Sequence, residues 1–579
     1  MKNAVLSDEL PVEGKPVARA VDGWLAAARA RIAGGLSPDA MCAAWVDVAL
    51  HMAQSPAHGT AMVAQGVRVW RDLAWFAAGQ VNPVLPKTQA PAAPDHRFVG
   101  PEWERWPYSG AVQSYLATEQ WLHDMFDGVE GALPHHRQLA AFAARQALAL
   151  AAPCNVPLAN PVVTRRIRET GGRCLIDGVM HLGEDVRRSA NGLPPVGSET
   201  QVVGRDVATA SGRVVYRNRL MELIQYDPTT DLVHPEPVLI VPAWIMKFYI
   251  LDLSPHNSMV RWLTAQGFTV FMISWHNPGE EEAGTGFADY IDMGPRAALD
   301  AIETLTGAAK VHTAGYCLGG TLLAIAAAAL ARDGDDRLAS LSLFTAQTDF
   351  SEPGEIGLFI DDDQVAALDA AMARRGYLSS GQMAGAFKAL RSEDLVWAHA
   401  VHTYLLGERE VLGDLMAWNA DGTRMPYAMH SEYLHRLFLE NALARGRFHV
   451  DDRAVTLSAL LVPVFSVGTE KDHVAPWRSV FKIHQLTEAE LTFVLASGGH
   501  NAGIVSEPGH PHRHYRVALR EAGASAPDPD EWLAGAEELA GSWWTLWAGW
   551  LAARSGVPTV PPPMGPNLAP APGTYVLER

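Results

Sequence analysis

The sequence has few cysteines, and their spacing excludes two common uses of this residue. Cys42, Cys154, Cys174 and Cys317 are the four cysteines among 579 residues, and no two of them form a CxxC pair. A disulfide framework or a cysteine-based zinc site needs closely spaced cysteines. We therefore expect a reducing, cytoplasmic environment and no bound metal.

Basic residues are also in short supply. Lys and Arg number 46 against 64 Asp and Glu, which gives a formal net charge of -18. A surface of this sign repels phosphate groups, and the sequence contains no basic run or basic-aromatic ladder. The composition therefore argues against nucleic acid as a partner.

Apolar runs long enough to span a bilayer are missing as well. The longest run of small apolar residues, LLAIAAAALA from Leu322, has about half of the roughly 20 residues that a membrane helix needs. The first residues, MKNAVLSDELPVEGKP, carry acids and a proline where a secretory signal has a basic start and an apolar core. We expect no transmembrane segment and no export signal.

The chain is too long for a single hydrophobic core, so we expect a catalytic domain with additional regions. Aliphatic and aromatic residues make up 48% and charged residues 19%, which is an ordinary globular composition. Apolar residues recur at helical spacing between residues 20 and 80, and Ser37-Pro38 marks a helix start after a Gly-Gly break. The N-terminal part is therefore predicted to be helical.

The sequence changes character at residue 237. Short apolar runs (PVLIVPA, FTVFMISW, KVHTAGY, LASLSLFTA) alternate with helical stretches, pause between 350 and 450, and resume with LLVPVFSVG and ELTFVLASGG. This alternation predicts a mostly parallel sheet with crossover helices, interrupted by a helical insertion. The predicted regions are a helical N-terminal segment (1–80), a linker (81–97), a second helical domain (98–236), an α/β catalytic domain (237–349 and 451–556), a cap or lid (350–450) and an extended proline-rich tail (557–579).

The strand KVHTAGY leads directly into the helical stretch CLGGTLLAIAAAALA. The turn between them reads GYCLGG, which is the G-x-S-x-G nucleophile elbow of the α/β-hydrolase fold with Cys317 in place of serine. Glycines allow the sharp turn, and backbone N–H groups at the helix start favour a thiolate. Cys317 is therefore the predicted nucleophile, while a buried small hydrophobe is the alternative that an isolated cysteine usually represents.

A thiol nucleophile needs a base, and this fold supplies an acid and then a histidine from loops after later strands. LLVPVFSVG is followed by TEKDH, and ELTFVLASGG by HNAG. We assign His500 as the general base and Asp472 as the carboxylate that orients it. Three alternatives stay open: Glu470 as the acid, His473 as the base, and a purely local capping role for Asp472.

The other histidines give weaker signals. His312 lies on a strand and is predicted to be packed. His510, His512 and His514 alternate in a proline-containing loop without acids or cysteines, which is a weak pattern for a metal site. We interpret these three as solvated surface.

An oxyanion hole in this fold takes one N–H from the residue after the nucleophile and one from the loop after an early strand. Leu318 and the stretch Ala243-Trp244-Ile245 occupy these positions. Aromatic residues gather near the same strand ends and between 532 and 550, where packing is a commoner role than lining an acyl tunnel. They are Trp244, Phe248, Tyr249, Trp275, Trp418 and Trp477, and Trp532, Trp543, Trp544, Trp547 and Trp550.

Longer stretches carry a combined pattern across the chain. They are ETGGRCLIDG from Glu169, KFYILDLSPHNSMVRWL from Lys247, AGYCLGGTL from Ala314, DFSEPGEIGLFID from Asp349, LRSEDLVW from Leu390, WNADGTRMP from Trp418, GTEKDHVAPW from Gly468, SGGHNAGIVSEPG from Ser497 and the final APGTYVLER. In combination they resemble the single-subunit polyhydroxyalkanoate (polyester) synthases of bacteria. The resemblance covers nearly the whole chain.

The resemblance implies that a polyester grows from (R)-3-hydroxyacyl-CoA, with 3-hydroxybutyryl-CoA as the expected unit, and that CoA is released. It assigns catalysis to Cys317, Asp472 and His500. It implies no cofactor besides the CoA thioester substrate, a location at polyester granules, and self-association that leaves a homodimer open. Two departures concern the acyl site: Ile245-Met246-Lys247 stands in place of an I-N-K triplet, and HNAGIVSEPG is more polar than the common G-H-I form.

Two other functions are compatible with the same residues. A Cys-dependent α/β-hydrolase or acyl-CoA thioesterase can use the same fold, since fold does not fix function. A non-catalytic granule-binding protein would not need an elbow, an acid and a histidine in this order. The sequence therefore favours a polymerising acyltransferase.

Overall fold

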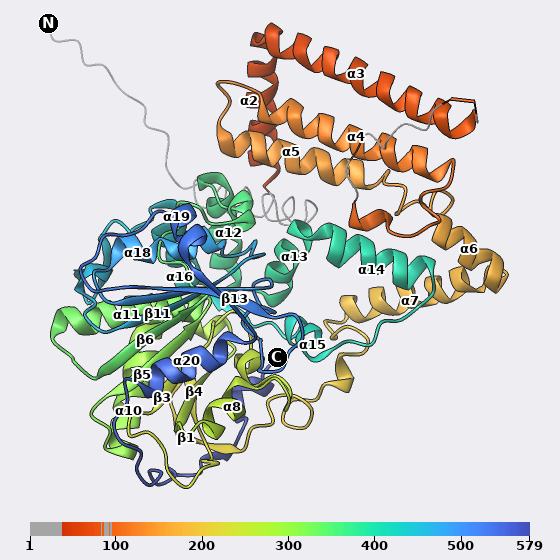
Figure 1. Cartoon of the computed structure of the whole chain (residues 1–579). Coiled ribbons are helices and arrows are strands. Elements are labelled where there is room, and N and C mark those ends of the chain that lie inside the picture. Colours follow the sequence, from red (N-terminus) through yellow and green to blue (C-terminus); the bar gives the residue numbers. More distant parts are fainter. Residues whose placement is uncertain (1–36, 83, 86–91, 93–94) are drawn as a thin grey trace, which may run out of the picture.

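The computed structural model describes residues 37–82, 84, 85, 92 and 95–579 (Figure 1). Residues 1–36 of the predicted N-terminal segment and about half of the predicted linker lie outside the described residues. The described N-terminal region is helical, as the sequence predicts. Its elements, in which η marks a short 3-10 or π helix, are α2 (Pro38–Gln54), α3 (Pro56–Val81), η2 (His96–Phe98), α4 (Tyr108–Asp127), α5 (Pro134–Ala149), α6 (Pro161–Thr170), α7 (Arg173–Ala190) and η3 (Ser198–Thr200).

Helix α2 begins where the sequence predicts. Ser37 is its N-cap, and the hydroxyl oxygen accepts a hydrogen bond from the N–H of Ala40 at 3.4 Å. Pro38 follows in the first turn, where no N–H is needed for helix hydrogen bonds. Local residue chemistry therefore fixes this helix start.

An 11-stranded sheet forms the centre of the second half of the chain (Figure 1). Its order is β14-β13-β12-β11-β6-β5-β3-β4-β2-β1-β15, parallel from β12 to β4 and antiparallel at both sides. The predicted fold class, an α/β-hydrolase fold with a mostly parallel sheet, is confirmed. The strands are β1 (Gly212–Arg217), β2 (Met221–Tyr226), β3 (Val238–Val241), β4 (Val270–Trp275), β5 (Val311–Tyr316), β6 (Leu338–Phe344), β11 (Val464–Thr469), β12 (Leu491–Ala496), β13 (His514–Arg520), β14 (Glu537–Ala540) and β15 (Ala569–Pro570).

The sheet extends beyond the segments in which the sequence predicts it. β1 and β2 precede residue 237, and β15 lies in the proline-rich tail and pairs with β1. The sequence does not indicate β2 as a buried strand because Glu222 and Gln225 interrupt its apolar residues. Both side chains are nevertheless buried and have polar partners. The division of the chain into domains stays a prediction.

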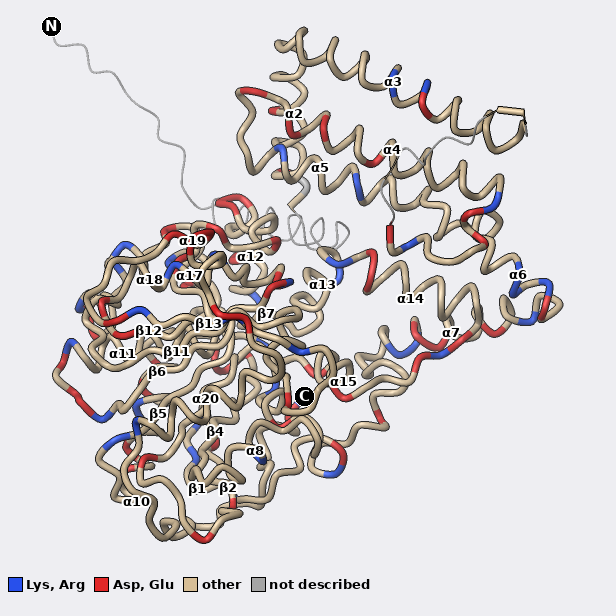
Figure 2. Tube along the Cα trace, in the orientation of Figure 1, with Lys and Arg blue, Asp and Glu red and all other residues tan. Residues whose placement is uncertain are grey.

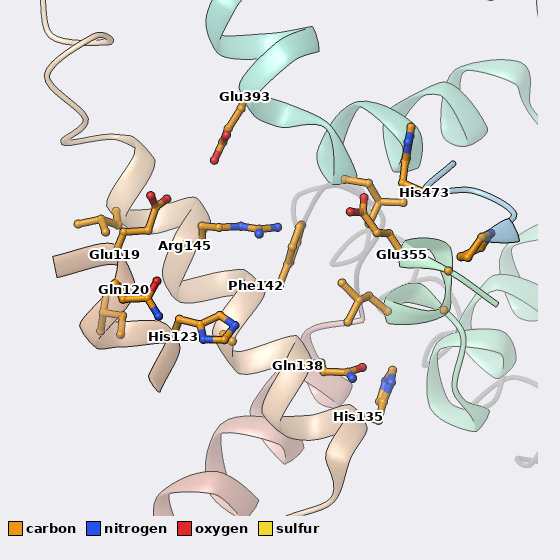
Figure 3. Close-up of a pocket in the computed structure, with 18 of the residues that line it drawn as sticks. Glu119, Gln120, His123, His135, Gln138, Phe142, Arg145, Glu355, Glu393 and His473 are labelled. Carbon is orange, nitrogen blue, oxygen red and sulfur yellow. The ribbon is translucent and has the colours of Figure 1, made fainter. Parts of the chain in front are cut away.

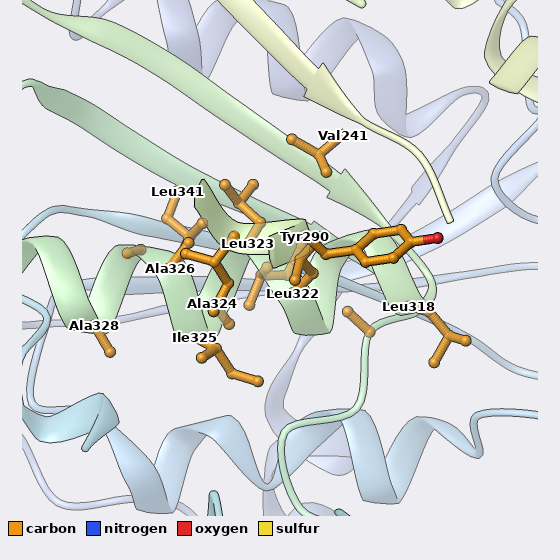
Figure 4. Packing of buried hydrophobic residues seen from close by; sticks show 14 of the residues in the cluster. Val241, Tyr290, Leu318, Leu322, Leu323, Ala324, Ile325, Ala326, Ala328 and Leu341 are labelled. Carbon is orange, nitrogen blue, oxygen red and sulfur yellow. The ribbon is translucent and has the colours of Figure 1, made fainter. Parts of the chain in front are cut away.

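Helices cover both faces of the sheet and bury two apolar clusters against it. Helix α11 is buried on nearly all sides, and its Leu322 and Leu323 share an apolar cluster with Leu341 of β6 (Figure 4). The tryptophans of α20 pack against the sheet as predicted, with Trp547 Nε1 donating to Ser342 Oγ at 2.9 Å. These elements are η4 (Phe248–Asp252), α8 (Met259–Ala265), η5 (Glu280–Glu282), α9 (Phe287–Ile291), η6 (Asp292–Arg296), α10 (Ala297–Thr306), α11 (Leu318–Asp333), η11 (Leu457–Ala459), α17 (Trp477–Phe481), α18 (Ile483–Leu486), α19 (Pro529–Gly535), α20 (Trp543–Ala552) and η12 (Tyr575–Leu577).

The predicted cap is helical, and the N-terminal helices rest on it. Arg97 joins Glu119 of α4 at 2.6 Å to Glu393 of the cap at 3.2 Å, and a Cβ on Gly178 of α7 would collide with the Tyr404 backbone. The cap elements are η7 (Glu355–Phe359), α12 (Asp362–Arg375), β7 (Tyr377–Leu378), α13 (Ser380–Leu390), η8 (Glu393–Trp397), α14 (Ala398–Ala400), η9 (Val401–Leu405), α15 (Asp414–Ala420), β8 (Met425–Pro426), α16 (Tyr427–Glu432), η10 (Tyr433–Leu439) and β9 (Phe448–Val450). Strand β10 (Arg453–Val455), just after the cap, pairs with β9.

Charged residues of both signs lie next to each other on α6 and α7 (Figure 2).

Within the described ranges, no helix is both long enough and apolar enough to cross a membrane.

Backbone segments approach each other closely where α11 begins. A Cβ on Gly319 would lie 2.3 Å from the carbonyl oxygen of Val241 and 2.4 Å from that of Pro242. Main-chain oxygens cannot rotate away as a flexible side chain can. We predict that Gly319→Ala lowers the free energy of unfolding by about 1–3 kcal/mol in urea denaturation.

The matched control is Gly549→Ala on α20, where a Cβ meets nothing within 4 Å. Because alanine is the better helix former, this change should raise stability by at most about 1 kcal/mol. Equal effects of the two substitutions would contradict the close approach at Gly319.

Candidate active site

Cys317 occupies the turn between β5 and α11 with φ = 53°, a region that cysteine rarely adopts. The turn is tight because glycines let the strand and helix touch: a Cβ on Gly315 would lie 2.4 Å from the Cα of Gly320. The sulfur is half-buried, at the carboxyl end of β5 and the N-terminus of α11. The predicted elbow therefore has the backbone that an exposed nucleophile needs.

His500 and Asp472 come together from separate loops, after β12 and β11. The Nδ1 atom of His500 lies 2.8 Å from Oδ2 of Asp472, and both side chains are buried. The other oxygen of Asp472 accepts the N–H groups of Val474 at 2.9 Å and Ala475 at 2.8 Å. The carboxylate thus orients the histidine and caps its own turn at once, so the two roles considered for it do not exclude each other.

The ring of His500 also interacts electrostatically with the sulfur of Cys317. Burial lowers the pKa of His500, but the charge of Asp472, the charge of Cys317 and the hydrogen bond to Asp472 outweigh burial and raise this pKa to about 10. The imidazole therefore holds its second proton at neutral pH, between a carboxylate and the sulfur.

Residues adjacent to these three form further contacts that the sequence reasoning missed. The hydroxyl of Tyr316 donates to Oδ1 of Asn501 at 2.5 Å, and the Tyr316 ring lies 5.8 Å from the ring of His500. Asn501 in turn donates to Asn419 of the cap at 3.3 Å. Tyr316 precedes Cys317 and Asn501 follows His500, and this adjacency is the feature of the sequence that could have identified them.

Tyr433 brings a cap side chain to the same place. Burial, and then the charge of Cys317, raise its pKa well above the ordinary value. Its ring packs against Trp244, Phe350 and Phe438, with centroids 6.1, 6.3 and 5.1 Å away. These rings form an aromatic wall contributed largely by the cap, and Cys317 packs against the apolar cluster to which they belong.

The predicted oxyanion residues lie beside the elbow. The close contact between Gly319 and Val241 places the end of β3, which leads into Trp244 and Ile245, against the turn that carries Leu318. The side chains of all three are buried, so their backbone groups are what they can offer to a substrate. Trp244 packs in the core, as do the other aromatics of this region except the half-buried Trp477.

The alternative acid and base have other partners. Glu470 lies 3.3 Å from the ring of His514, and Arg391 donates to Nδ1 of His473 at 3.0 Å. Burial and the charge of Arg391 lower the pKa of His473. His312 is packed, as predicted, between two serine hydroxyls at 2.7 and 3.0 Å.

Among the residues that the structure describes, no group of three or more His, Cys, Asp or Glu could hold a metal ion.

A cavity of about 1500 Å³ separates α4 and α5 from the cap and reaches Asp472 and His473 (Figure 3). Phe142 and Arg145 of α5 project into it from one side and Glu355 of the cap from the other (Figure 3). Six carboxylate side chains and three arginines line it: Asp72, Asp95, Glu119, Glu355, Glu393 and Asp472, with Arg97, Arg145 and Arg445. This balance disfavours a ligand with several negative charges.

Family models match most of the chain. The model described as poly-beta-hydroxybutyrate polymerase N-terminus matches residues 94–263, a second model for the N terminal part of that polymerase matches residues 16–58, and the alpha/beta hydrolase fold matches residues 236–507.

Similar proteins extend over most of the length. The poly(3-hydroxyalkanoate) polymerase of Methylorubrum extorquens is 42% identical over 84% of this chain and 82% of its own. The polymerase subunit of Rhizobium meliloti is 39% identical over 84% and 80%, and that of Cupriavidus necator is 36% identical over 84% and 83%. These values, together with the elbow and its surroundings, establish that the chain belongs to the poly(3-hydroxyalkanoate) polymerase family of α/β-hydrolase-fold enzymes.

Proposed function

We propose that this enzyme polymerises (R)-3-hydroxyacyl-CoA, with 3-hydroxybutyryl-CoA as the expected unit, and releases CoA. The observation that carries the proposal is the sulfur of Cys317 at a strained turn, with an electrostatic interaction to a histidine that a buried carboxylate orients. Membership of the polymerase family selects polyester synthesis from the reactions that such a site supports.

In the first step, the sulfur of Cys317 attacks the thioester carbonyl while the imidazolium of His500 keeps the sulfur ionised. The tetrahedral intermediate places its negative oxygen near the N–H groups of Leu318 and of the Trp244–Ile245 segment. Collapse of this intermediate breaks the bond to CoA, whose sulfur takes the proton from His500. The acyl group then remains on Cys317 as a thioester.

In the second step, the hydroxyl of a bound unit attacks the acyl group on Cys317. We assign its deprotonation to His500, because Asp472 is buried and both of its oxygens already accept hydrogen bonds. The proton passes to His500 as the ester bond forms and the Cys317 sulfur leaves. The lengthened chain is then the CoA thioester of that unit, and attack by Cys317 as in the first step returns it to the sulfur and releases CoA.

Sulfur suits this reaction because each transfer from CoA exchanges one thioester for another at nearly equal free energy. The acyl group keeps its activation for the later attack by a hydroxyl, so the reaction needs no cofactor besides the thioester. Water must be excluded meanwhile, and the buried aromatic wall around Tyr433 supports that role for the cap.

The cavity between the N-terminal helices and the cap suits the uncharged polyester better than CoA. Its lining carboxylates outnumber its arginines by six to three, which disfavours the negatively charged phosphates of CoA. At about 1500 Å³ it exceeds the roughly 300–1,000 Å³ of ordinary small-molecule sites. Because a long polyester is insoluble and stays bound to Cys317, the enzyme would lie at the surface of its granule.

The first prediction concerns the products. With (R)-3-hydroxybutyryl-CoA, the unmodified enzyme should release CoA and form insoluble polyester, and Cys317→Ala should abolish both. Chromatography of the products distinguishes the alternative, because a Cys-dependent hydrolase or thioesterase would yield free 3-hydroxybutyrate alone. Granule binding with the same CoA release in Cys317→Ala would instead indicate a non-catalytic protein.

The second prediction ranks the partners of the cysteine. His500→Gln should lower kcat for CoA release by about 10³-fold or more, since it removes the base. Asp472→Asn should lose less, because the base itself remains and loses only its charged orienting partner. Glu470→Gln is the matched control, and a loss as large as that of Asp472→Asn would make Glu470 the acid.

The third prediction concerns pH. His500 keeps its proton until the pH rises through its raised pKa, near 10, so the Cys317–His500 pair is maintained from neutral pH up to that value. Alkylation of Cys317 by iodoacetamide should therefore change less than about threefold between roughly pH 7 and pH 9. Mass spectrometry of the labelled peptides gives the rates.

Exposed Cys42 provides the internal reference for the labelling conditions. In His500→Gln, the alkylation rate of Cys317 should depend more steeply on pH than in the unmodified enzyme. A steep profile for Cys317 in the unmodified enzyme would contradict the pairing.

A further inference from the structure

Lys247 is a buried cation for which the reaction described above has no use. It closes the Ile245-Met246-Lys247 triplet after β3, and only 3% of the residue is exposed. Its ammonium donates to two main-chain carbonyls, Tyr575 O at 3.1 Å and Glu578 O at 2.8 Å. A buried ammonium is costly unless it is bound, so this cation must serve the arrangement of the segments that it joins.

The segment that Lys247 holds is itself fixed to the sheet. Glu222 of β2, which is fully buried, accepts the N–H of Thr574 at 2.8 Å and of Tyr575 at 3.0 Å. The carboxylate of Glu578 accepts the N–H of Asn277, just after β4, at 2.8 Å. Residues 574–578 therefore connect two strands of the rigid sheet to the ammonium of Lys247.

The cap holds the opposite side of the same loop. The hydroxyl of Thr423 donates to the carbonyl of Trp244 at 2.6 Å, and Nε1 of Trp418 donates to the carbonyl of Lys247 at 2.7 Å. Because a trans peptide is planar, fixing the carbonyl of Trp244 also fixes the N–H of Ile245, which points the opposite way. The loop from 243 to 247 is thus held by the cap on its carbonyls and by residues 575–578 on its lysine.

We propose that Lys247 is a positioning residue for acyl transfer: by bonding to residues 575–578 it fixes the loop whose N–H group stabilises the oxyanion. This inference rests on the proposed function. An oxyanion donor acts only at the correct distance, and a displacement of about 1 Å can cost on the order of 10²-fold in rate. The effect should appear in the transition state and not in the binding of the thioester.

The test is Lys247→Met, which keeps the length of the side chain and removes its hydrogen bonds. We expect kcat for CoA release from (R)-3-hydroxybutyryl-CoA to fall at least about tenfold with KM changed less than about twofold. The alkylation rate of Cys317 by iodoacetamide should be unchanged, since this reaction needs the Cys317–His500 pair and no oxyanion donor. A merely structural role would lower both rates together.

The matched control is Lys310→Met, which removes a surface lysine that pairs with Asp336. It should alter neither rate. A second variant, Lys247→Gln, keeps a polar group in the buried site on a shorter side chain and should show the same separation of kcat from alkylation if Lys247→Met fails to fold.

Unchanged kcat in Lys247→Met, or a parallel loss of kcat and alkylation in the folded variants, would overturn the role of Lys247 and leave the proposed function intact. Absence of CoA release and polyester from the unmodified enzyme would instead overturn the proposed function, and the role of Lys247 with it.

Discussion

The active-site architecture depends on one constraint, the backbone contact where β5 turns into α11. Glycines at 315, 319 and 320 let the helix start touch the ends of β5 and β3, and Cys317 takes a positive φ in the turn. Burial of α11 on nearly all sides stabilises this strained conformation. The same contact presents the sulfur and brings the loop after β3 beside it.

A second feature of the site is that the carboxylate of Asp472 has two roles. One oxygen holds the ring of His500, and the other binds the N–H groups of its own turn. The turn therefore fixes the orientation of the carboxylate, and the carboxylate in turn orients the ring of His500. Tyr316 and Asn501 add a contact between the elbow and the histidine loop, which Asn419 extends to the cap.

The cap connects the reaction centre to the rest of the chain. It contributes Tyr433 beside the sulfur and Thr423 against the loop after β3, and it also carries the N-terminal helices through the ion pairs of Arg97. Movement of the cap would therefore alter the aromatic wall and the loop together. The N-terminal helices, placed on the cap, are positioned to limit such movement.

The sequence by itself determined the fold class, the helix start at Ser37 and the elbow, because each follows from local propensity and short spacing. It also predicted that Asp472 and His500 follow successive strands, and parallel strands bring such loops to one edge of a sheet. It could not identify β2, whose buried Glu222 accepts hydrogen bonds from Thr574 and Tyr575 more than 350 residues away, or the pairing of Lys247 with residues 575–578. Only the tertiary structure decided these, because a buried polar group is explained by its partner, and the partner is distant in sequence.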